Sequence, residues 1–156
     1  MTKTAQIMAA LKAALAAAGL TVLDPDSPDE AEPIEPTGDD ATVRDDIERP
    51  YAFQDMPCVI LDCGDEYPDP VVGMGWVYWN LEVLVLIAAE GPVPKMAPES
   101  TRTAVHAALY ADRTLGGTVI DLTVGPISRG TDAVNLACGV TQDVYKLKYR
   151  TMEGTA

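Results

Sequence analysis

The side chains best suited to acid–base or nucleophilic chemistry are few and form no familiar catalytic pattern. His106 is the only histidine, and no carboxylate stands four residues before or after it to orient its ring. Ser128 lies in Gly-Pro-Ile-Ser-Arg-Gly, which is not the Gly-x-Ser-x-Gly turn of a hydrolase nucleophile. The sequence therefore predicts a structural histidine, no catalytic residue and no enzyme.

Metal and phosphate sites have equally little support. Cys58 and Cys63 are five residues apart, so in a strand they face opposite sides, and Cys138 stands alone. We expect three buried structural thiols, reduced as in a cytosolic protein. The Gly-Met-Gly at 73–75 precedes a strand, whereas phosphate loops open a helix. The sequence thus predicts neither a metal nor a cofactor.

An aromatic cluster is the first candidate for a contact surface. It consists of Trp76, Tyr78 and Trp79. We expect Trp79 to pack in the core, and Trp76 and Tyr78 to pack at an edge or an interface. No basic groove is evident beside them, so binding of single-stranded nucleic acid is not predicted.

A regular basic set is the second candidate. Lys146, Lys148 and Arg150 recur at period two, which places them on one face of a final strand. Three interpretations stay open: a solvated face, an edge protected against pairing, or a patch that meets a neighbour's acidic surface.

Composition bounds the class of protein. The 156 residues are 47% hydrophobic, with a mean hydropathy of +0.04, which predicts one folded domain over 1–156. Eleven basic against 24 acidic residues give a net charge of −13, which disfavours nucleic acid as a partner. Residues 24–48 hold 11 of the acidic residues, one arginine and four prolines. We interpret this stretch as an acidic, proline-rich loop or arm.

Hydrophobic periodicity predicts two helices and several strands. An amphipathic helix of about four turns follows Thr2 or Thr4 as cap and ends near Gly19, and Lys12 interrupts it too early for a signal peptide. A second helix covers 98–111, with Ala104, Val105, Ala108 and Leu109 as its buried stripe. We expect strands at 20–23, 56–63, 76–89, 118–124, 133–138 and 143–151, with a loop at 64–75.

These elements predict an α+β fold. We expect a mixed, largely antiparallel sheet with both helices packed on one face. The strand at 76–89 is too short to span a bilayer and carries Glu82, so no membrane association is predicted. Its length suggests that it projects beyond its sheet.

The segment between the second helix and the next strand has a recognisable form. Residues 109–121 read Leu-Tyr-Ala-Asp-Arg-Thr-Leu-Gly-Gly-Thr-Val-Ile-Asp. The two glycines permit positive φ and a sharp reversal, and Leu115 can fold back onto the helix. Asp112, Arg113 and Thr114 either fix this turn or face a neighbouring subunit. The six-residue motif runs from Asp112 to Gly117: Asp112, Arg113, Thr114, Leu115, Gly116 and Gly117.

This motif and the order of elements resemble the tail terminator family of long-tailed bacteriophages, also called tail completion proteins, to which the lambda-type minor tail protein U is related. The resemblance covers residues 1–23 and 50–154, and includes the Ala/Leu-rich first helix and Met56-Pro57 at a strand entry. Residues 24–48 match nothing in the family.

The resemblance implies a structural virion protein that forms a homohexameric ring on the tail tube. Such a ring stops tube polymerisation and presents the head–tail joining surface, with the tail tube protein and a head–tail connector or neck protein as partners. Its place would be the head-proximal end of the virion tail, and the host cytoplasm during assembly. Six acidic copies would let DNA slide through the lumen without specific binding. The alternatives are another neck or head-completion subunit, or a small cytosolic ligand-binding domain or enzyme.

Overall fold

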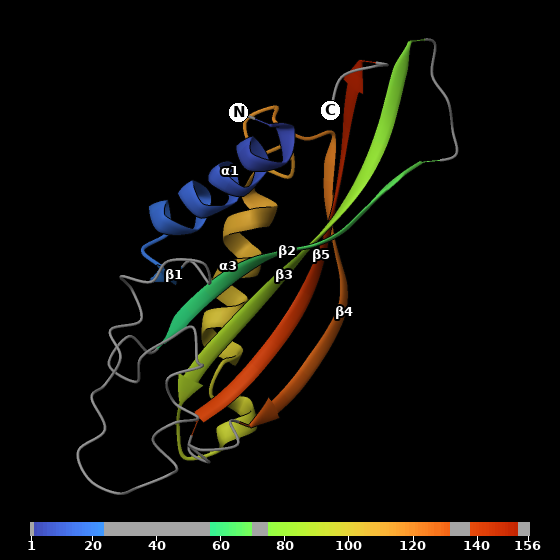
Figure 1. Cartoon of the computed structure of the whole chain (residues 1–156). Coiled ribbons are helices and arrows are strands. Elements are labelled where there is room, and N and C mark those ends of the chain that lie inside the picture. Colours follow the sequence, from blue (N-terminus) through green and yellow to red (C-terminus); the bar gives the residue numbers. More distant parts are fainter. Residues whose placement is uncertain (1, 24–56, 70–74, 132–137, 153–156) are drawn as a thin grey trace, which may run out of the picture.

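In the part of the chain that the computed structural model describes, a five-stranded mixed sheet carries two α-helices on one face (Figure 1). The structure describes residues 2–23, 57–69, 75–131 and 138–152. The predicted α+β class is confirmed. The acidic stretch at 24–48 lies outside the described residues. The elements are α1 (Lys3–Ala17), β1 (Val22–Leu23), β2 (Cys58–Pro68), β3 (Trp76–Glu90), the 3-10 turn η2 (Pro94–Met96), α3 (Glu99–Ala111), β4 (Asp121–Thr131) and β5 (Cys138–Met152).

The first helix begins and ends as its sequence predicts. The Thr2 hydroxyl oxygen accepts a hydrogen bond from the Ala5 amide at 3.2 Å, which satisfies one free N–H of the first turn. Gly19 follows the helix with φ +81°, a conformation that costs glycine little. Ile7, Leu11 and Leu15 are completely buried, so one stripe of α1 packs on the sheet.

The strands lie in the order β1-β2-β3-β5-β4. β1 pairs in parallel with β2, and the other pairings between the described strands are antiparallel. β3 and β5 are both 15 residues long and pair without a register shift from Trp76↔Met152 to Glu90↔Cys138. These two strands are therefore the centre of the sheet.

Several predicted strand boundaries are wrong. β1 covers only Val22–Leu23 of the predicted 20–23, and β4 begins at Asp121 instead of residue 118. In the other direction, β2 continues to Pro68 instead of ending at residue 63, β4 continues to Thr131 instead of residue 124, and β5 begins at Cys138 instead of residue 143. Residues 133–137 of the separate strand predicted at 133–138 lie outside the described residues. Each extension pairs with β3 or β5. A long neighbouring strand supplies backbone hydrogen-bonding partners, so a strand can continue through residues whose composition is typical of a loop.

The side of the sheet covered by the helices carries the main core. Alternate residues of β3 and β5 point to it, and they pack with the buried stripes of α1 and α3. In α3 the buried residues are Thr101, Val105 and Leu109, whereas Ala104 is exposed, contrary to prediction. The buried stripe of α3 therefore includes Thr101, from its first turn, and not Ala104.

The opposite side of the sheet carries a smaller apolar cluster at one end. Its buried members are Leu23, Cys58, Ile60, Ala88 and Cys138. The rest of that side is intermediate or exposed along β5, where Gln142, Lys146 and Arg150 are exposed. We call this side the open face.

The long strand does not project beyond its sheet as predicted, because β5 pairs with it along its whole length. β4 begins opposite Lys148, so β3 and β5 continue past it as far as the pair Trp76↔Met152. Figure 1 shows these two strands also running past the helices at that end. We call this part of the sheet the ribbon end. In the described residues, no helix is long and apolar enough to cross a membrane.

Gly139 marks the closest approach between η2 and the sheet, and it yields a prediction. A Cβ at Gly139 would lie 1.7 Å from the carbonyl oxygen of Pro94 and 2.9 Å from Cδ of Pro98. We expect Gly139→Ala to lower the free energy of unfolding by about 1–3 kcal/mol, because backbone must move. Gly130→Ala, on β4 with open space at its Cβ, is the matched control. Equal urea midpoints for the two variants would contradict the close contact.

Candidate functional site

The motif at 112–117 forms a turn held by Asp112. Its Oδ1 accepts hydrogen bonds from the Thr114 amide at 3.0 Å and the Thr114 hydroxyl at 2.6 Å, and its Oδ2 accepts one from the Gly116 amide at 2.7 Å. The hydrogen bond from the Thr114 side chain, followed by those from the two amides, lowers the pKa of Asp112. Of the two roles left open by the sequence, Asp112 and Thr114 therefore fix the turn.

Leu115, Gly116 and Gly117 all adopt positive φ, at 50°, 68° and 84°. Leu115 is buried in the core, as predicted, and this packing offsets the cost of a left-handed leucine. Arg113 ties the turn to the following strand: its Nη2 lies 2.8 Å from Asp121 Oδ2, and its Nε donates to the Leu122 carbonyl oxygen at 3.1 Å.

The five residues predicted as an interface lie on one side of the sheet. Arg150 is paired with Tyr78 and Lys146 with Glu82, which places their side chains on the open face. The Arg150 guanidinium carbon lies 4.5 Å from the centroid of the Trp76 ring, and Lys148 Nζ lies 5.5 Å from that of Tyr78. Lys148 also forms an ion pair with Asp69 at 2.9 Å. Trp79 points the other way, packs against the core and donates to Thr151.

A groove of about 490 Å³ connects the motif with this aromatic and basic surface. It is lined by Lys3, Trp76, Tyr78, Gly117, Thr118, Val119, Ile120, Tyr149 and Arg150. None of these lining residues is acidic, although the whole chain carries −13. The groove therefore suits a partner that offers apolar groups beside a negative charge. The basic surroundings of Trp76 and Tyr78 come from Lys3, Lys148 and Arg150, which only the tertiary structure brings there.

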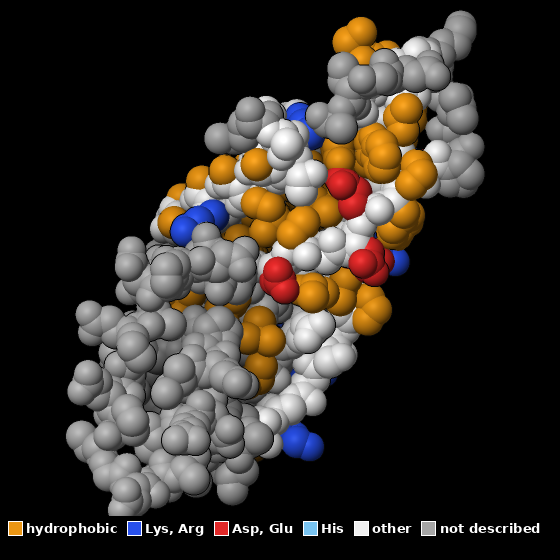
Figure 2. Space-filling model, viewed as in Figure 1, with side chains coloured by type: hydrophobic (Ala, Val, Ile, Leu, Met, Phe, Trp, Pro, Cys, Tyr) orange, Lys and Arg blue, Asp and Glu red, His pale blue; other side chains and the backbone are white. Residues whose placement is uncertain are grey.

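The face of the molecule seen in Figure 2 carries acidic side chains, unlike the groove. There, acidic side chains lie where β2 crosses the molecule, among patches of hydrophobic side chains. The acidic residues of β2 are Asp62, Asp65 and Glu66. Glu66 accepts hydrogen bonds from the Tyr149 hydroxyl and, at 3.2 Å, from the Thr4 hydroxyl, so it joins β2, β5 and α1. Partial burial, and next the bond to Glu66, raise the pKa of Tyr149 to about 12.

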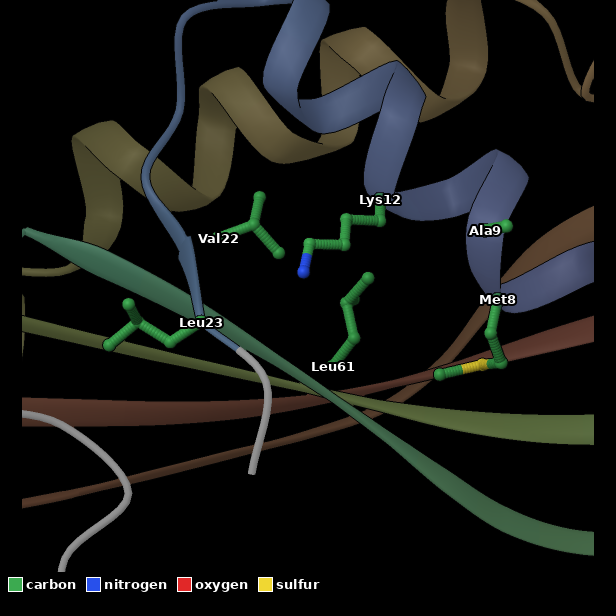
Figure 3. Close-up of a pocket in the computed structure, with 6 residues that line it drawn as sticks. All are labelled: Met8, Ala9, Lys12, Val22, Leu23 and Leu61. Carbon is green, nitrogen blue, oxygen red and sulfur yellow. The ribbon is translucent and has the colours of Figure 1, made fainter. Parts of the chain in front are cut away.

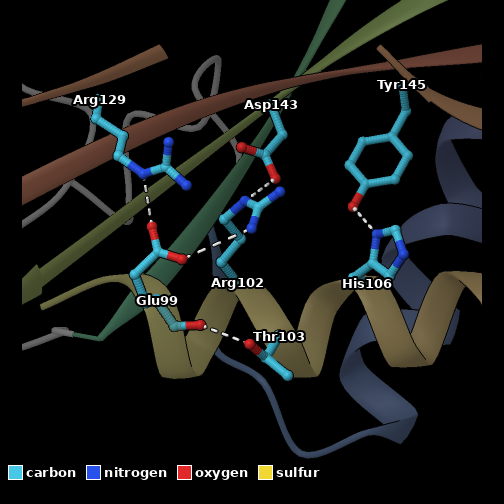
Figure 4. Close-up of polar contacts among 7 residues, drawn as sticks. All are labelled: Glu99, Arg102, Thr103, His106, Arg129, Asp143 and Tyr145. Atoms are coloured by element: carbon cyan, nitrogen blue, oxygen red, sulfur yellow. Dashed lines mark hydrogen bonds and ion pairs between the residues drawn. The ribbon is translucent and has the colours of Figure 1, made fainter. Parts of the chain in front are cut away.

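A network of charges between α3 and the sheet was not predicted from the sequence (Figure 4). Asp143 on β5 is completely buried, and its Oδ2 lies 2.9 Å from Nε of Arg102. Glu99 continues the network, with Oε1 at 2.7 Å from Nε of Arg129 on β4 and Oε2 at 3.6 Å from Arg102. The available signal was parity, because Asp143 falls on the same side of its strand as Tyr145 and Leu147.

The network shifts the pKa values of its two carboxylates, Asp143 and Glu99, in opposite directions. Burial raises the pKa of Asp143, and Arg102 only partly opposes this effect. The hydrogen bond from Arg129 lowers the pKa of Glu99. Asp143 Oδ1 and the neighbouring Thr141 Oγ1 are both buried with no hydrogen-bond partner among the described residues, and burying a polar atom without such a partner is costly.

His106 makes packing contacts in this structure. Its ring stacks on Tyr110 with centroids 4.2 Å apart, and its Nδ1 lies 3.5 Å from the Tyr145 hydroxyl (Figure 4). Burial raises the pKa of Tyr145, so that hydroxyl stays protonated. This arrangement suits a structural histidine between α3 and β5.

The cysteines are only partly as predicted. Cys58 and Cys138 are buried, but Cys63 is exposed, although it falls on the same side of β2 as the buried Val59 and Leu61. Partial burial of its thiol, followed by Glu66 and Asp62, raises the pKa of Cys63 and disfavours a reactive thiolate. Among the described residues, no group of His, Cys, Asp and Glu side chains is placed to hold a metal ion.

A second hollow of about 210 Å³ lies between α1, β1 and β2. It is lined by Met8, Ala9, Lys12, Val22, Leu23 and Leu61, and Figure 3 shows the Lys12 amine pointing into it. The sequence gave no signal for this hollow, because its walls come from three elements that meet only in the fold.

The comparisons with known proteins do not add to this picture. No family model matches the chain, and no curated protein matches it either.

The turn yields a prediction about pH. The lowered pKa of Asp112 means that its contribution to stability is complete above its ordinary value of 3.8 and is lost as pH falls through the folded-state pKa. Asp112→Ala should therefore be less stable than the wild type at neutral pH, and the two should converge in acid. Asp121→Ala, which removes the carboxylate paired with Arg113 and leaves the hydrogen bonds within the turn, serves as control. A difference that is constant with pH would show that the carboxylate charge is not involved.

The buried ion pair between Arg102 and Asp143 yields a prediction about stability. Asp143→Ala removes the carboxylate at 2.9 Å from Arg102, which is 18% exposed, and leaves it, among the described residues, the longer ion pair with Glu99 at 3.6 Å, so we expect a loss of about 3 kcal/mol in the free energy of unfolding. The loss for Arg102→Ala plus Asp143→Ala together should be smaller than the sum of the single losses. Gln142→Ala, at the exposed neighbouring position, controls for changes in the strand. Additive losses in denaturant unfolding would contradict the coupling.

Proposed function

We propose that this protein is a tail terminator of a long-tailed bacteriophage. In this role it forms a hexameric ring at the head-proximal end of the tail tube, stops tube polymerisation and provides the surface that joins the tail to the head. The proposal assigns the chain a structural role in the virion and no catalytic residue. Its starting point is the resemblance of residues 109–121, within an α+β fold whose helix α3 leads into that turn.

The observation that carries the proposal is the shared groove. Gly117, from the motif that bears the resemblance, lines the same groove as Trp76, Tyr78 and Arg150. A turn needed only to reverse the chain has no need to border an aromatic and basic surface. The groove therefore supports a contact between this chain and a neighbouring subunit of an assembly.

Capping by a ring follows from symmetry. In a closed ring, each subunit uses one surface toward the next copy and a different surface toward the previous one. One rim of such a ring matches the end of the tube, and the other rim offers no equivalent face for a further tube subunit. Growth then stops without any chemical step.

The charge of the chain fits a passage for DNA. Each copy carries −13, so a ring of six would repel a DNA duplex from its wall instead of binding it. Most of this charge belongs to residues 24–48, which lie outside the described residues. A lumen lined by acidic groups is part of the proposal.

The experiment is growth of tail tubes from purified tube protein, with and without this protein. We expect capped tubes of limited length, and negative-stain images with a six-fold ring at one end only. Binding to the portal or connector, with no effect on tube growth, would instead identify a neck subunit. Failure to act on either assembly, together with stabilisation of a monomer by a small ligand, would favour a binding domain or enzyme.

The groove provides the variant for this assay. Arg150→Glu places a carboxylate beside the Trp76 ring, in a groove that has no acidic lining residue. We expect it to reduce capping, because it would repel the negative charge that the groove suits. Gln142→Glu makes a similar change at another exposed site of the same strand and should cap normally. Equal capping by both variants would remove the groove from the proposal.

A further inference from the structure

The groove beside the motif presents apolar groups and cations that a single chain leaves uncovered. Two of its lining side chains, Trp76 and Ile120, are 36% and 43% exposed, and Arg150 lies over the Trp76 ring. Among the described residues neither Lys3 nor Arg150 forms an ion pair, whereas the nearby Lys148 does. The groove therefore offers two cations and an apolar surface to another molecule.

The chain itself contains a stretch of the opposite character. Residues 32–36 read Glu-Pro-Ile-Glu-Pro. They belong to the acidic segment 24–48, which lies outside the described residues and whose 11 acidic residues and one arginine give it a net charge of −10. Two carboxylates and an isoleucine within five residues are the negative and apolar groups that the groove suits.

The two prolines of this stretch suit an aromatic groove. Proline fixes its own φ and restricts the residue before it to extended backbone, so Glu32 and Glu35 are restricted as well. Binding therefore costs less conformational entropy than binding of an ordinary loop. Aromatic surfaces such as those of Trp76 and Tyr78 are the usual partners of proline-rich segments.

We infer that the groove of one copy binds residues 32–36 of the next copy. This inference rests on the ring of the proposed function and names the contact between its subunits. The two carboxylates of the stretch face Arg150 and Lys3, and its apolar groups pack on Trp76. Because a groove meets a segment, the contact is heterologous, the type that closes into a ring. Only two of the 11 acidic residues of the segment take part, so the others remain available to the acidic lumen.

Reach favours the next copy over the same copy. The segment begins after Leu23, which pairs with Ile60 and so lies level with Leu86 of β3. From Leu86 back to Trp76 the strand extends roughly 33 Å. Residues 32–36 follow Leu23 by 9 to 13 positions, and a fully extended chain of that length spans at most about 30–45 Å. Within one copy the stretch would need nearly full extension, whereas a neighbour in a ring can present it without that cost.

Site-directed crosslinking tests where the contact lies and which copy supplies it. In a Cys63→Ser background, Ile120→Cys marks the groove and Thr37→Cys marks the segment, because Cys58 and Cys138 are buried. With a short bismaleimide reagent, each single variant should stay uncrosslinked, and an equal mixture of the two should give dimers. A mixture without dimers, or a double variant that is crosslinked only within one chain, would overturn the inference.

Charge reversal tests the recognition. Glu32→Lys with Glu35→Lys should weaken self-association about tenfold or more by light scattering, as should Arg150→Glu, because each brings like charges together. A mixture of these two variants should associate again, since the altered segment of one meets the altered groove of the other. Asp45→Lys with Asp46→Lys makes the same change in net charge elsewhere in the segment and should associate normally. Circular dichroism verifies that all variants are folded.

Each failure points to a different conclusion. Equal losses in the control and in Glu32→Lys with Glu35→Lys would attribute the effect to net charge and overturn the inference. Tube protein crosslinked to Ile120→Cys in place of the segment would give the groove to the tube instead. A wild-type protein that stays monomeric across a concentration series would also overturn the inference, whereas the tube-growth assay judges the proposed function separately.

Discussion

The pairing of β3 with β5 is the constraint on which the rest of the structure depends. Fifteen residues of each strand pair in one uninterrupted register, from Trp76↔Met152 to Glu90↔Cys138. Because side chains alternate along a strand, this single register decides which residues face the helices and which form the open face. A slip of one residue would place Lys146 and Lys148 under α3 and leave Tyr145 and Leu147 in solvent.

The two sides of this pair have different roles. The helix side combines the apolar core with one buried charge, Asp143, which Arg102 of α3 partly neutralises. The open face carries Tyr78, Lys148 and Arg150, with cations lying over aromatic rings. Since β4 stops short of the last residues of β5, the same strands also produce the ribbon end and its groove. Core, groove and proposed subunit contact are thus consequences of one long pairing.

Local signals were sufficient wherever a feature depends on neighbouring residues. The Thr2 cap, Gly19 after α1, and the glycines of the turn at 112–117 follow from backbone chemistry that is visible in a few letters. Strand ends were predicted less well: β2 passes through Gly64 and Asp65 to Pro68, because β3 supplies hydrogen-bonding partners beyond the apolar stretch. The role of Asp143 was missed because its partners lie on α3, 41 residues away in the case of Arg102.

The sequence by itself determined the α+β class, the two helices, the long central strand and the reversal after α3, because each depends on periodicity or on conformations that glycine permits. It also determined that Lys146, Lys148 and Arg150 share one side of a strand. Only the tertiary structure decided that Trp76 and Arg150 meet, that Lys3 and Gly117 join them in a groove, and that Arg102 reaches Asp143. These contacts connect elements that are distant along the chain, and their formation depends on how the sheet is ordered and where each strand stops.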